Sequence, residues 1–196
     1  MSMNKPKRFQ HHDYWSGPVP SFGDTKAKLL VIGLAPAING GNRTGRMFTG
    51  DSTGDWLIRA LYETGFASAP YSYSANDGLE LKKAYVTSSV KCAPPMNKPT
   101  LQEIYQCSIH LKNELRLLEG SLRVIVTLGH VAFNSFCRIT DTKRLKFNHG
   151  ASYRIGDDKY LLVSYHPSRR NTNTKLLSWK SWIDIFETAK HLIGDG

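Results

Sequence analysis

Four short apolar runs recur along the chain, and polar segments and helical patterns separate them. The runs cover residues 28–34, 84–90, 123–129 and 160–165. Short apolar runs with polar boundaries are typical of strands that are buried on both faces. Apolar residues at helical spacing occupy about 54–66, 100–119, 130–137 and 178–193. This alternation predicts an α/β fold in which helices cover both faces of a parallel sheet.

Two of the predicted helices carry local signals. Thr100 followed by Glu103 forms a capping box, which starts the second long helix. In the last helix, Trp182 and Phe186 lie on one apolar face. No repeat, low-complexity segment or linker divides the chain. We therefore expect residues 1–196 to form a single domain, with residues 1–27 as an arm packed over it.

The segment 35–55, between the first strand and the first helix, is rich in glycine and poor in apolar side chains. Long loops at the carboxyl end of a parallel strand are where α/β folds bind ligands, and glycine lets a backbone approach the ligand closely. The spacing matches neither a P-loop nor a GxGxxG motif, so a nucleoside triphosphate is not the expected ligand. The alternative is a surface loop without a function. Long loops within compact domains are usually functional, which disfavours this alternative.

Charge and cysteine content narrow the class of protein. The 26 Lys and Arg residues outnumber the 16 Asp and Glu residues and give a formal net charge of +10. This excess favours a polyanionic partner, most simply nucleic acid, with an unspecific basic surface as the alternative. No segment predicts a transmembrane helix or a secretory signal. Three cysteines suit a reducing compartment, so we expect a cytoplasmic protein without a membrane partner.

Polar side chains follow three of the predicted strands, and parallel strands would gather them at one edge of the sheet. An aspartate, an asparagine and a histidine from three loops, above an apolar floor, would form a binding or catalytic site. Each one alone is weak evidence, because a histidine after a strand is more often structural. The candidates are Asn39, Asn42, Arg43, Phe48 and Asp51; Lys91, Cys92 and Asn97; and His166, Ser168, Arg169 and Arg170.

Three blocks of the sequence resemble the motifs of the type-5 uracil-DNA glycosylases, the UDGb branch of that superfamily. The first block comprises GLAPA at 33–37, GNRTGR at 41–46 and FTGD at 48–51. The second comprises KCAPP at 91–95 and NKPT at 97–100, and the third SYHPS at 164–168 and NTNT at 171–174. The resemblance covers nearly the whole chain. It implies a three-layer αβα sandwich around a central four-stranded parallel sheet.

The resemblance also implies an activity, the hydrolysis of the N-glycosidic bond of uracil in DNA during base-excision repair. Such an enzyme extrudes the damaged base from the duplex and binds it in a pocket. Asp51 would hold or activate the attacking water. His166 would stabilise the departing base anion. Asn97 would position the substrate or the water, with a role in the turn as the alternative.

Further residues would bind the base and the DNA by the same resemblance. Phe48 would stack on the extruded base, with loop packing as its alternative role. The other expected base-binding residues are Gly33, Ala35 and Asn39. The expected DNA-binding residues are Arg43, Arg169 and Arg170. For Arg169 and Arg170 the alternative is a role as solvated surface arginines.

Two positions depart from the related type-4 enzymes. Leu34 stands where those enzymes carry an acidic residue, and Ser88 stands where they carry an asparagine that reads the uracil edge. Without that asparagine, discrimination between bases should loosen. We therefore expect uracil and other deaminated bases, such as hypoxanthine or xanthine, to be substrates.

The cysteines match only half of the family's cofactor site. The family holds a [4Fe-4S] cluster with four cysteines, the first two in an N-terminal Cys-x-x-Cys. Cys92 and Cys107 match the last two ligands, whereas Cys137 reads as a buried helix residue. Either the chain begins downstream of the true start, the interpretation that we favour, or this member has lost the cluster. The chemistry itself needs no cofactor.

Two other functions remain as alternatives. A catalytically silent nucleic-acid-binding module would have little reason to keep both Asp51 and His166 within their motifs. A nucleotide hydrolase would need more metal-binding carboxylates than Asp51 and Asp55. We therefore expect a monomeric glycosylase that acts on DNA.

Overall fold

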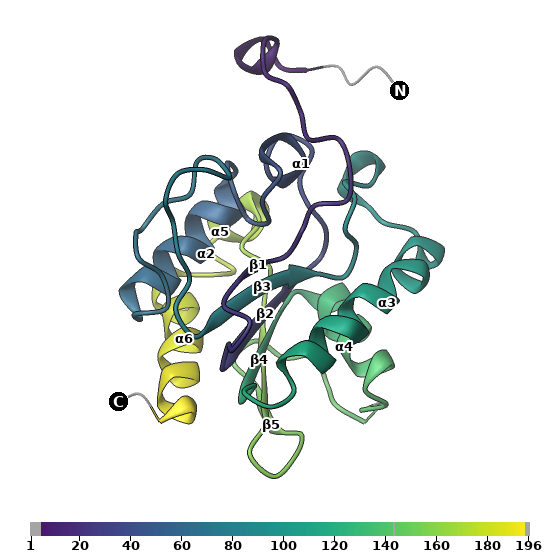
Figure 1. Ribbon diagram of the computed structural model, residues 1–196. Coiled ribbons are helices and arrows are strands. Elements are labelled where there is room, and N and C mark those ends of the chain that lie inside the picture. The colour runs from purple at the N-terminus through teal and green to yellow at the C-terminus, as the bar shows by residue number, and fades with distance from the viewer. Residues whose placement is uncertain (1–4, 143, 195–196) are drawn as a thin grey trace.

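A computed structural model describes residues 5–142 and 144–194, and its centre is one twisted sheet (Figure 1). Four parallel strands form the middle of the sheet, β2 (Leu29–Gly33), β3 (Ala84–Ser88), β4 (Val124–Leu128) and β6 (Tyr160–Ser164). The order across the sheet is β1-β3-β2-β4-β6-β5. The predicted four-stranded parallel sheet is confirmed. The antiparallel edge strands β1 (Phe22–Gly23) and β5 (Ser152–Arg154) make the whole sheet mixed and six-stranded.

Helices cover both faces of the sheet and produce three layers (Figure 1). Along β2, Leu29 and Val31 point to one core, whereas Leu30 and Ile32 point to the other. The first core lies under α2 (Ser52–Glu63) and α6 (Trp179–Ile193). The second core lies under α3 (Leu101–Leu118) and α4 (His130–Ile139). Because both faces of β2 are buried, its sequence is continuously apolar rather than alternating.

Local caps fix where the long helices begin. Thr100 and Glu103 form the predicted capping box of α3. Asp51 caps α2, and Ser178 caps α6 through the backbone amide of Ser181. All four long helices lie within about three residues of the ranges that the apolar pattern predicts.

The sequence pattern did not predict several short elements. The glycine-rich segment contains α1 (Gly41–Thr44), and α5 (Arg169–Asn173) follows the fourth parallel strand. The 3₁₀ helices η1 (Lys7–Phe9) and η2 (Pro95–Asn97) are also short. The glycine-rich segment is therefore folded more tightly than an irregular loop.

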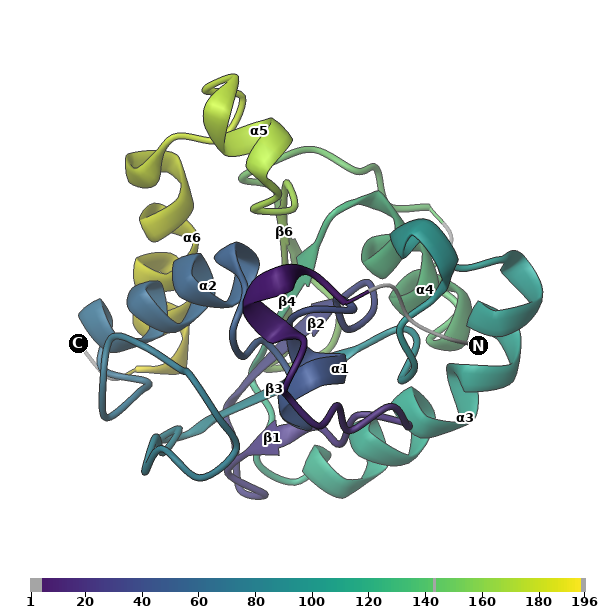
Figure 2. The same ribbon diagram turned by 90° about the horizontal axis from the view of Figure 1, so that it is seen from above.

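The segment before β2 first passes over the carboxyl edge of the sheet, near α1, and then descends beside β3 as β1 (Figure 1 and Figure 2). The guanidinium of Arg43 in α1 lies 4.3 Å from the ring centroid of Phe9 in η1. Val19 is buried in the first core, and Phe22 pairs with Val86 of β3. Residues 1–4 of the expected arm lie outside the described residues. No helix among residues 5–142 and 144–194 is both long enough and apolar enough to span a bilayer.

Candidate active site

A cavity of about 230 Å³ opens at the carboxyl edge of the parallel strands. It receives side chains from the segments that follow β2, β3 and β6. Four predicted site residues line it together, although they are distant in the chain: Phe48, Asp51, Asn97 and His166. Pockets for drug-sized ligands measure roughly 300–1,000 Å³. The smaller volume here suits one small ring system.

Phe48 forms one wall of the cavity in a strained backbone conformation. Its φ is 53°, in the left-handed region that aromatic residues rarely adopt. Its ring lies against Gly33 at the end of β2, where a β-carbon would come within 2.6 Å of Phe48 Cζ. Gly33 does not line the cavity itself. Because glycine has no side chain, it leaves the space that the Phe48 ring occupies.

Asp51 is held from two sides. Its Oδ1 accepts hydrogen bonds from the backbone amides of Thr53 (2.9 Å) and Gly54 (3.0 Å). Its Oδ2 lies so close to Gly40 that a β-carbon there would overlap it. Burial raises the pKa of Asp51, while the two amides and then the charges of Arg43 and Arg169 oppose this shift. The N-terminal end of the α2 dipole also favours the carboxylate.

His166 lies two residues beyond the end of β6, and its backbone is fixed locally. Its carbonyl accepts hydrogen bonds from the amide of Ser168 and the side chain of Asn171, both at 2.8 Å. Gly129 packs against its side chain so closely that a β-carbon at Gly129 would lie 3.1 Å from His166 Cβ. Burial lowers the pKa of His166 to about 4. The imidazole is therefore neutral near pH 7.

Asn97 reaches the cavity from an exposed loop that is anchored at both ends. At one end, Lys91 is buried and forms an ion pair with Glu114 at 2.7 Å. At the other end is the capping box that begins with Thr100. Between these anchors Met96 and Asn97 are exposed and have φ values of 53° and 56°.

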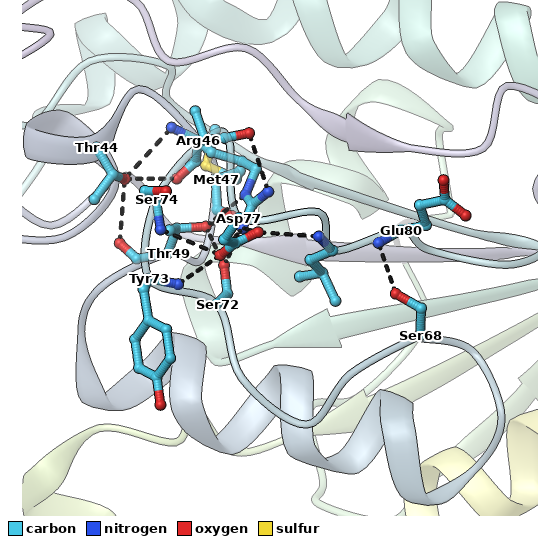
Figure 3. A network of polar contacts seen from close by, with 12 residues as sticks. Thr44, Arg46, Met47, Thr49, Ser68, Ser72, Tyr73, Ser74, Asp77 and Glu80 are labelled. Atoms are coloured by element: carbon cyan, nitrogen blue, oxygen red, sulfur yellow. Dashed lines mark hydrogen bonds and ion pairs between the residues drawn. The ribbon is translucent and has the colours of Figure 1, made fainter.

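A buried polar network connects Arg46 and Thr49, in the segment that carries Phe48 and Asp51, with Ser72 and Asp77 (Figure 3). The Arg46 Nη2 atom donates to both carboxylate oxygens of Asp77 at 2.7 Å and to Ser72 Oγ at 2.7 Å. The Ser72 hydroxyl also lies 2.6 Å from the Thr49 hydroxyl. Burial acts to raise the pKa of Asp77, but Arg46 and three backbone amides outweigh burial and lower this pKa to about 2. This segment is therefore tied to the loop at residues 67–80.

The predicted DNA-binding arginines lie in different surroundings. Arg169 lines the cavity, and its Nε donates to Ser52 Oγ at 3.3 Å. Arg170 is exposed on α5. Arg43 is half-buried, and its Nε donates to the carbonyl of Asn39 at 2.9 Å. Their contacts with DNA stay predictions.

The two other predicted base-binding residues also differ in position. Ala35 lines the cavity. Asn39 stands outside the residues that line it, and its Oδ1 accepts a hydrogen bond from the Tyr14 hydroxyl at 2.7 Å. Asn39 therefore links the N-terminal segment to the site, and its contact with a base stays a prediction.

Several residues that line the cavity were not among the candidates predicted from the sequence. These are Pro36, Ala37, Gly41, Met47 and Thr53. Thr53 also links two walls, because its hydroxyl donates to the carbonyl of Pro167 at 3.5 Å. Pro36, Ala37 and Gly41 lie within the motif blocks. The apolar Met47, between two motif residues, was the available signal for a further lining position.

The cysteines do not fit a four-thiolate cluster. Cys92 is exposed, Cys107 is half-buried and Cys137 is buried in the second core. Partial burial, and then the nearby Cys107, raise the pKa of the Cys92 thiol. Among the described residues, no group of three or more His, Cys, Asp or Glu side chains could hold a metal ion.

Comparisons with known proteins show the family to which the chain belongs. The family model of the uracil DNA glycosylase superfamily matches residues 20–189. A type-5 uracil-DNA glycosylase from Pyrobaculum aerophilum is 42% identical over 183 residues, covering 93% of this chain and 80% of the relative. One from Thermus thermophilus is 41% identical, covering 98% of this chain and 88% of the relative.

A relative from the type-4 branch is less similar to this chain. A type-4 uracil-DNA glycosylase from Archaeoglobus fulgidus is 30% identical over 156 residues, covering 76% of this chain and 70% of the relative. The type-5 relatives are thus more similar over a longer part of the chain. This chain belongs to the uracil-DNA glycosylase superfamily and, within it, to the type-5 branch.

Proposed function

We propose that this protein removes uracil from DNA by hydrolysing the bond between base and sugar, the first step of base-excision repair. The observation that carries the proposal is the cavity shared by Phe48, Asp51, Asn97 and His166. The names of the type-5 relatives and a net charge of +10, which suits a polyanion, support it.

The base must leave the duplex before it can enter a cavity of about 230 Å³. Phe48 offers a flat ring as one wall, and the seat left by Gly33 fixes that ring before the base arrives. Stacking on a fixed ring would favour a planar base without selecting its hydrogen-bonding edge. In this proposal Phe48 binds the base, and other groups act on the bond.

Asp51 is the group proposed to act on water. One oxygen is occupied by the two amides of α2, so the other can face a water molecule beside the sugar. As the bond from C1′ to the base nitrogen breaks, the sugar gains positive charge, which a carboxylate stabilises. The water oxygen bonds to C1′, and Asp51 accepts the proton that the water loses.

His166 is proposed to stabilise the electron pair that leaves with the base. Its pKa of about 4 keeps the imidazole neutral at pH 7. A neutral imidazole can donate one N–H hydrogen bond to a base oxygen as negative charge grows there. It does so without transferring its proton in the step that breaks the bond.

Arg169 and Arg170 are proposed to grip the phosphates around the extruded nucleotide. Arg169 stands at the cavity mouth, and Arg170 is exposed beside it on α5. Asn97 would close over the nucleotide from the opposite loop. For Arg43, whose guanidinium already bonds to the loop carbonyl of Asn39, we propose a contact with DNA at the edge of this surface.

The base range is proposed to extend beyond uracil. The Ser88 hydroxyl donates to the carbonyl of Val90 at 2.7 Å, so the side chain is engaged by its own backbone. Leu34 contributes an apolar side chain to the cavity. A pocket with few groups that read base edges would accept hypoxanthine or xanthine as well.

A cleavage assay tests the activity. Wild-type protein, Asp51→Ala and His166→Ala are incubated with an oligonucleotide duplex that contains one uracil, and abasic sites are revealed by alkaline cleavage. We expect strand breaks with wild type and a loss of at least about a hundredfold in each variant. DNA binding by the wild type without abasic sites on any lesion would favour the silent binding module.

The same assay on a panel of lesions tests the base range. Duplexes with uracil, hypoxanthine or xanthine at one position are compared at equal enzyme concentration. We expect cleavage at uracil and at one or more deaminated purines. Cleavage at uracil alone would contradict the wide base range and would leave the glycosylase activity intact.

A further inference from the structure

Two tyrosines form an exposed aromatic surface beside the candidate active site. Tyr71 and Tyr73 are 49% and 63% exposed. Their ring centroids lie 5.0 Å apart, and the ring planes differ by 19°, so the rings are stacked on each other. We call them the tyrosine pair. The catalytic proposal uses neither of them.

The tyrosine pair is fixed to the wall of the cavity. Ser72, between the two tyrosines, is only 2% exposed. Its carbonyl accepts a hydrogen bond from the Gly50 amide at 3.1 Å, and its hydroxyl contacts Thr49 at 2.6 Å. Thr49 and Gly50 are the residues between Phe48 and Asp51. The loop that carries the tyrosine pair is therefore hydrogen-bonded to the segment that carries Phe48 and Asp51, the proposed base-stacking and water-holding residues.

Further hydrogen bonds fix the backbone that carries the rings before any ligand binds. Asp77 accepts hydrogen bonds from the amides of Tyr73 (2.7 Å) and Ser74 (3.2 Å), and Arg46 neutralises its charge. Figure 3 shows the Tyr73 side chain pointing away from this network while Ser72 and Thr49 point into it. A ligand that stacks on such rings loses little affinity to the ordering of the loop.

The chemistry of the loop selects bases over phosphates. Residues 67–80 contain no lysine or arginine, and the nearby Arg46 is buried in its ion pair. The loop therefore lacks a cation for a phosphate but offers flat faces. Exposed aromatic rings bind nucleobases by stacking, with little sequence preference. When one nucleotide is extruded, each neighbouring base loses a stacking partner on one face. An exposed tyrosine ring can stack on that face.

We propose that the tyrosine pair stacks against a nucleobase next to the extruded nucleotide and holds the opened strand. The inference rests on the proposed function, because it needs DNA with one nucleotide in the cavity. It adds a second aromatic contact outside the pocket, separate from Phe48.

Binding measurements test the pair without requiring turnover. The probe is a labelled duplex with one 2′-fluoro uracil nucleotide, whose glycosidic bond resists hydrolysis. Tyr71→Ala and Tyr73→Ala, singly and together, are compared with the matching phenylalanine variants. The control is Tyr62→Ala, another exposed tyrosine, about 15 Å along α2 from its first turn. We expect the double alanine variant to bind between about five- and a hundredfold more weakly. The phenylalanine variants and the control should stay within about twofold of wild type.

A second probe identifies the partner. The base on one side of the uracil, and then the base on the other side, is replaced by an abasic tetrahydrofuran. Removing the contacted base should weaken the wild type but not the double alanine variant. Equal affinity of wild type and double variant for the intact probe would overturn the inference, as would equal losses for both proteins on removing either base. Excision of uracil by wild type in the cleavage assay separates these outcomes from failure of the proposed function.

Discussion

Two of the loops that line the candidate active site are held in very different ways. The Asp51 segment, residues 40–55, is tied by Arg43 and Arg46 to neighbouring backbone and to Asp77, and it continues into α2. The Asn97 loop, residues 92–99, is fixed at its ends. At its tip Met96 is 81% exposed. Both loops nevertheless meet at one cavity.

This difference suggests that the two loops have different roles in the reaction. A group that stabilises charge in a transition state works best when its position is fixed beforehand, as that of Asp51 is. A group on an exposed loop can adjust when the substrate arrives and can close the site over it. We therefore expect Asp51 to determine the rate of bond cleavage and Asn97 to affect mainly how tightly the nucleotide is held.

The largest effect should follow from Asp51→Asn. Asparagine keeps the cap of α2, so the free energy of unfolding should hardly change. It removes the negative charge and the proton acceptor, so single-turnover excision should fall by about 10²- to 10⁴-fold. Asp55→Asn, at an exposed position in the same helix, is the control and should retain most of the activity. Retention of a tenth of the wild-type rate by Asp51→Asn would remove the catalytic distinction between the loops.

The next effect concerns the network behind the Asp51 segment. Asp77→Ala leaves the guanidinium of Arg46 buried without its carboxylate, which should lower the free energy of unfolding by about 3–5 kcal/mol. Urea denaturation measures the change. The matched variant Asp184→Ala breaks the exposed pair with Lys180 and should cost below about 0.5 kcal/mol. Equal losses in the two variants would mean that the network does not hold the segment.

A third prediction uses the pH dependence of stability. The pKa of His166 is about 4 in the folded protein against 6.5 ordinarily, so the unfolded chain binds more protons between these values. The stability contributed by neutral His166 is present above pH 6.5 and is lost as the pH falls towards 4. Between pH 7.5 and 4.5 the wild type should lose roughly 2–3 kcal/mol through this group.

His166→Asn removes that titration and should therefore flatten the urea-midpoint profile over the same pH range. His110→Asn, at an exposed position on α3, serves as the control and should keep the wild-type profile. A wild-type profile in His166→Asn would show that burial of this imidazole does not govern the acid side of the stability curve.

Sequence patterns were sufficient for elements with strong local signals. Thr100 and Glu103 fix the start of α3 through contacts three residues apart, and the four apolar runs became the four parallel strands. The edge strands β1 and β5 have only two and three residues. Their pairing depends on strands far away in the chain, so no local pattern announces them.

The site shows the same limit. Parallel strands end at one edge of the sheet, so the predicted topology placed Asp51 and His166 near each other. In the structure both line one cavity. The pairing of Arg46 with Asp77 spans 31 residues and arises from loop packing. Likewise, the sequence does not say that Arg43 bonds to the carbonyl of Asn39. The sequence therefore did not predict contacts between residues that only the tertiary structure brings together.

The smallest effect, and the one that tests the Asn97 loop directly, comes from two substitutions at the same residue. Asn97 has a φ of 56°, which glycine adopts freely and alanine does not. Asn97→Gly removes the side chain without straining the loop, and the loss of one hydrogen bond should weaken substrate affinity by about tenfold or less. Asn97→Ala adds a backbone cost of about 1 kcal/mol, which urea denaturation would detect. Because an exposed loop can relax, we expect the bond-cleavage rate at saturating DNA to change little in either variant. If Asn97→Gly instead lowered that rate as far as Asp51→Asn does, the two loops would be equally organised for catalysis despite their different packing.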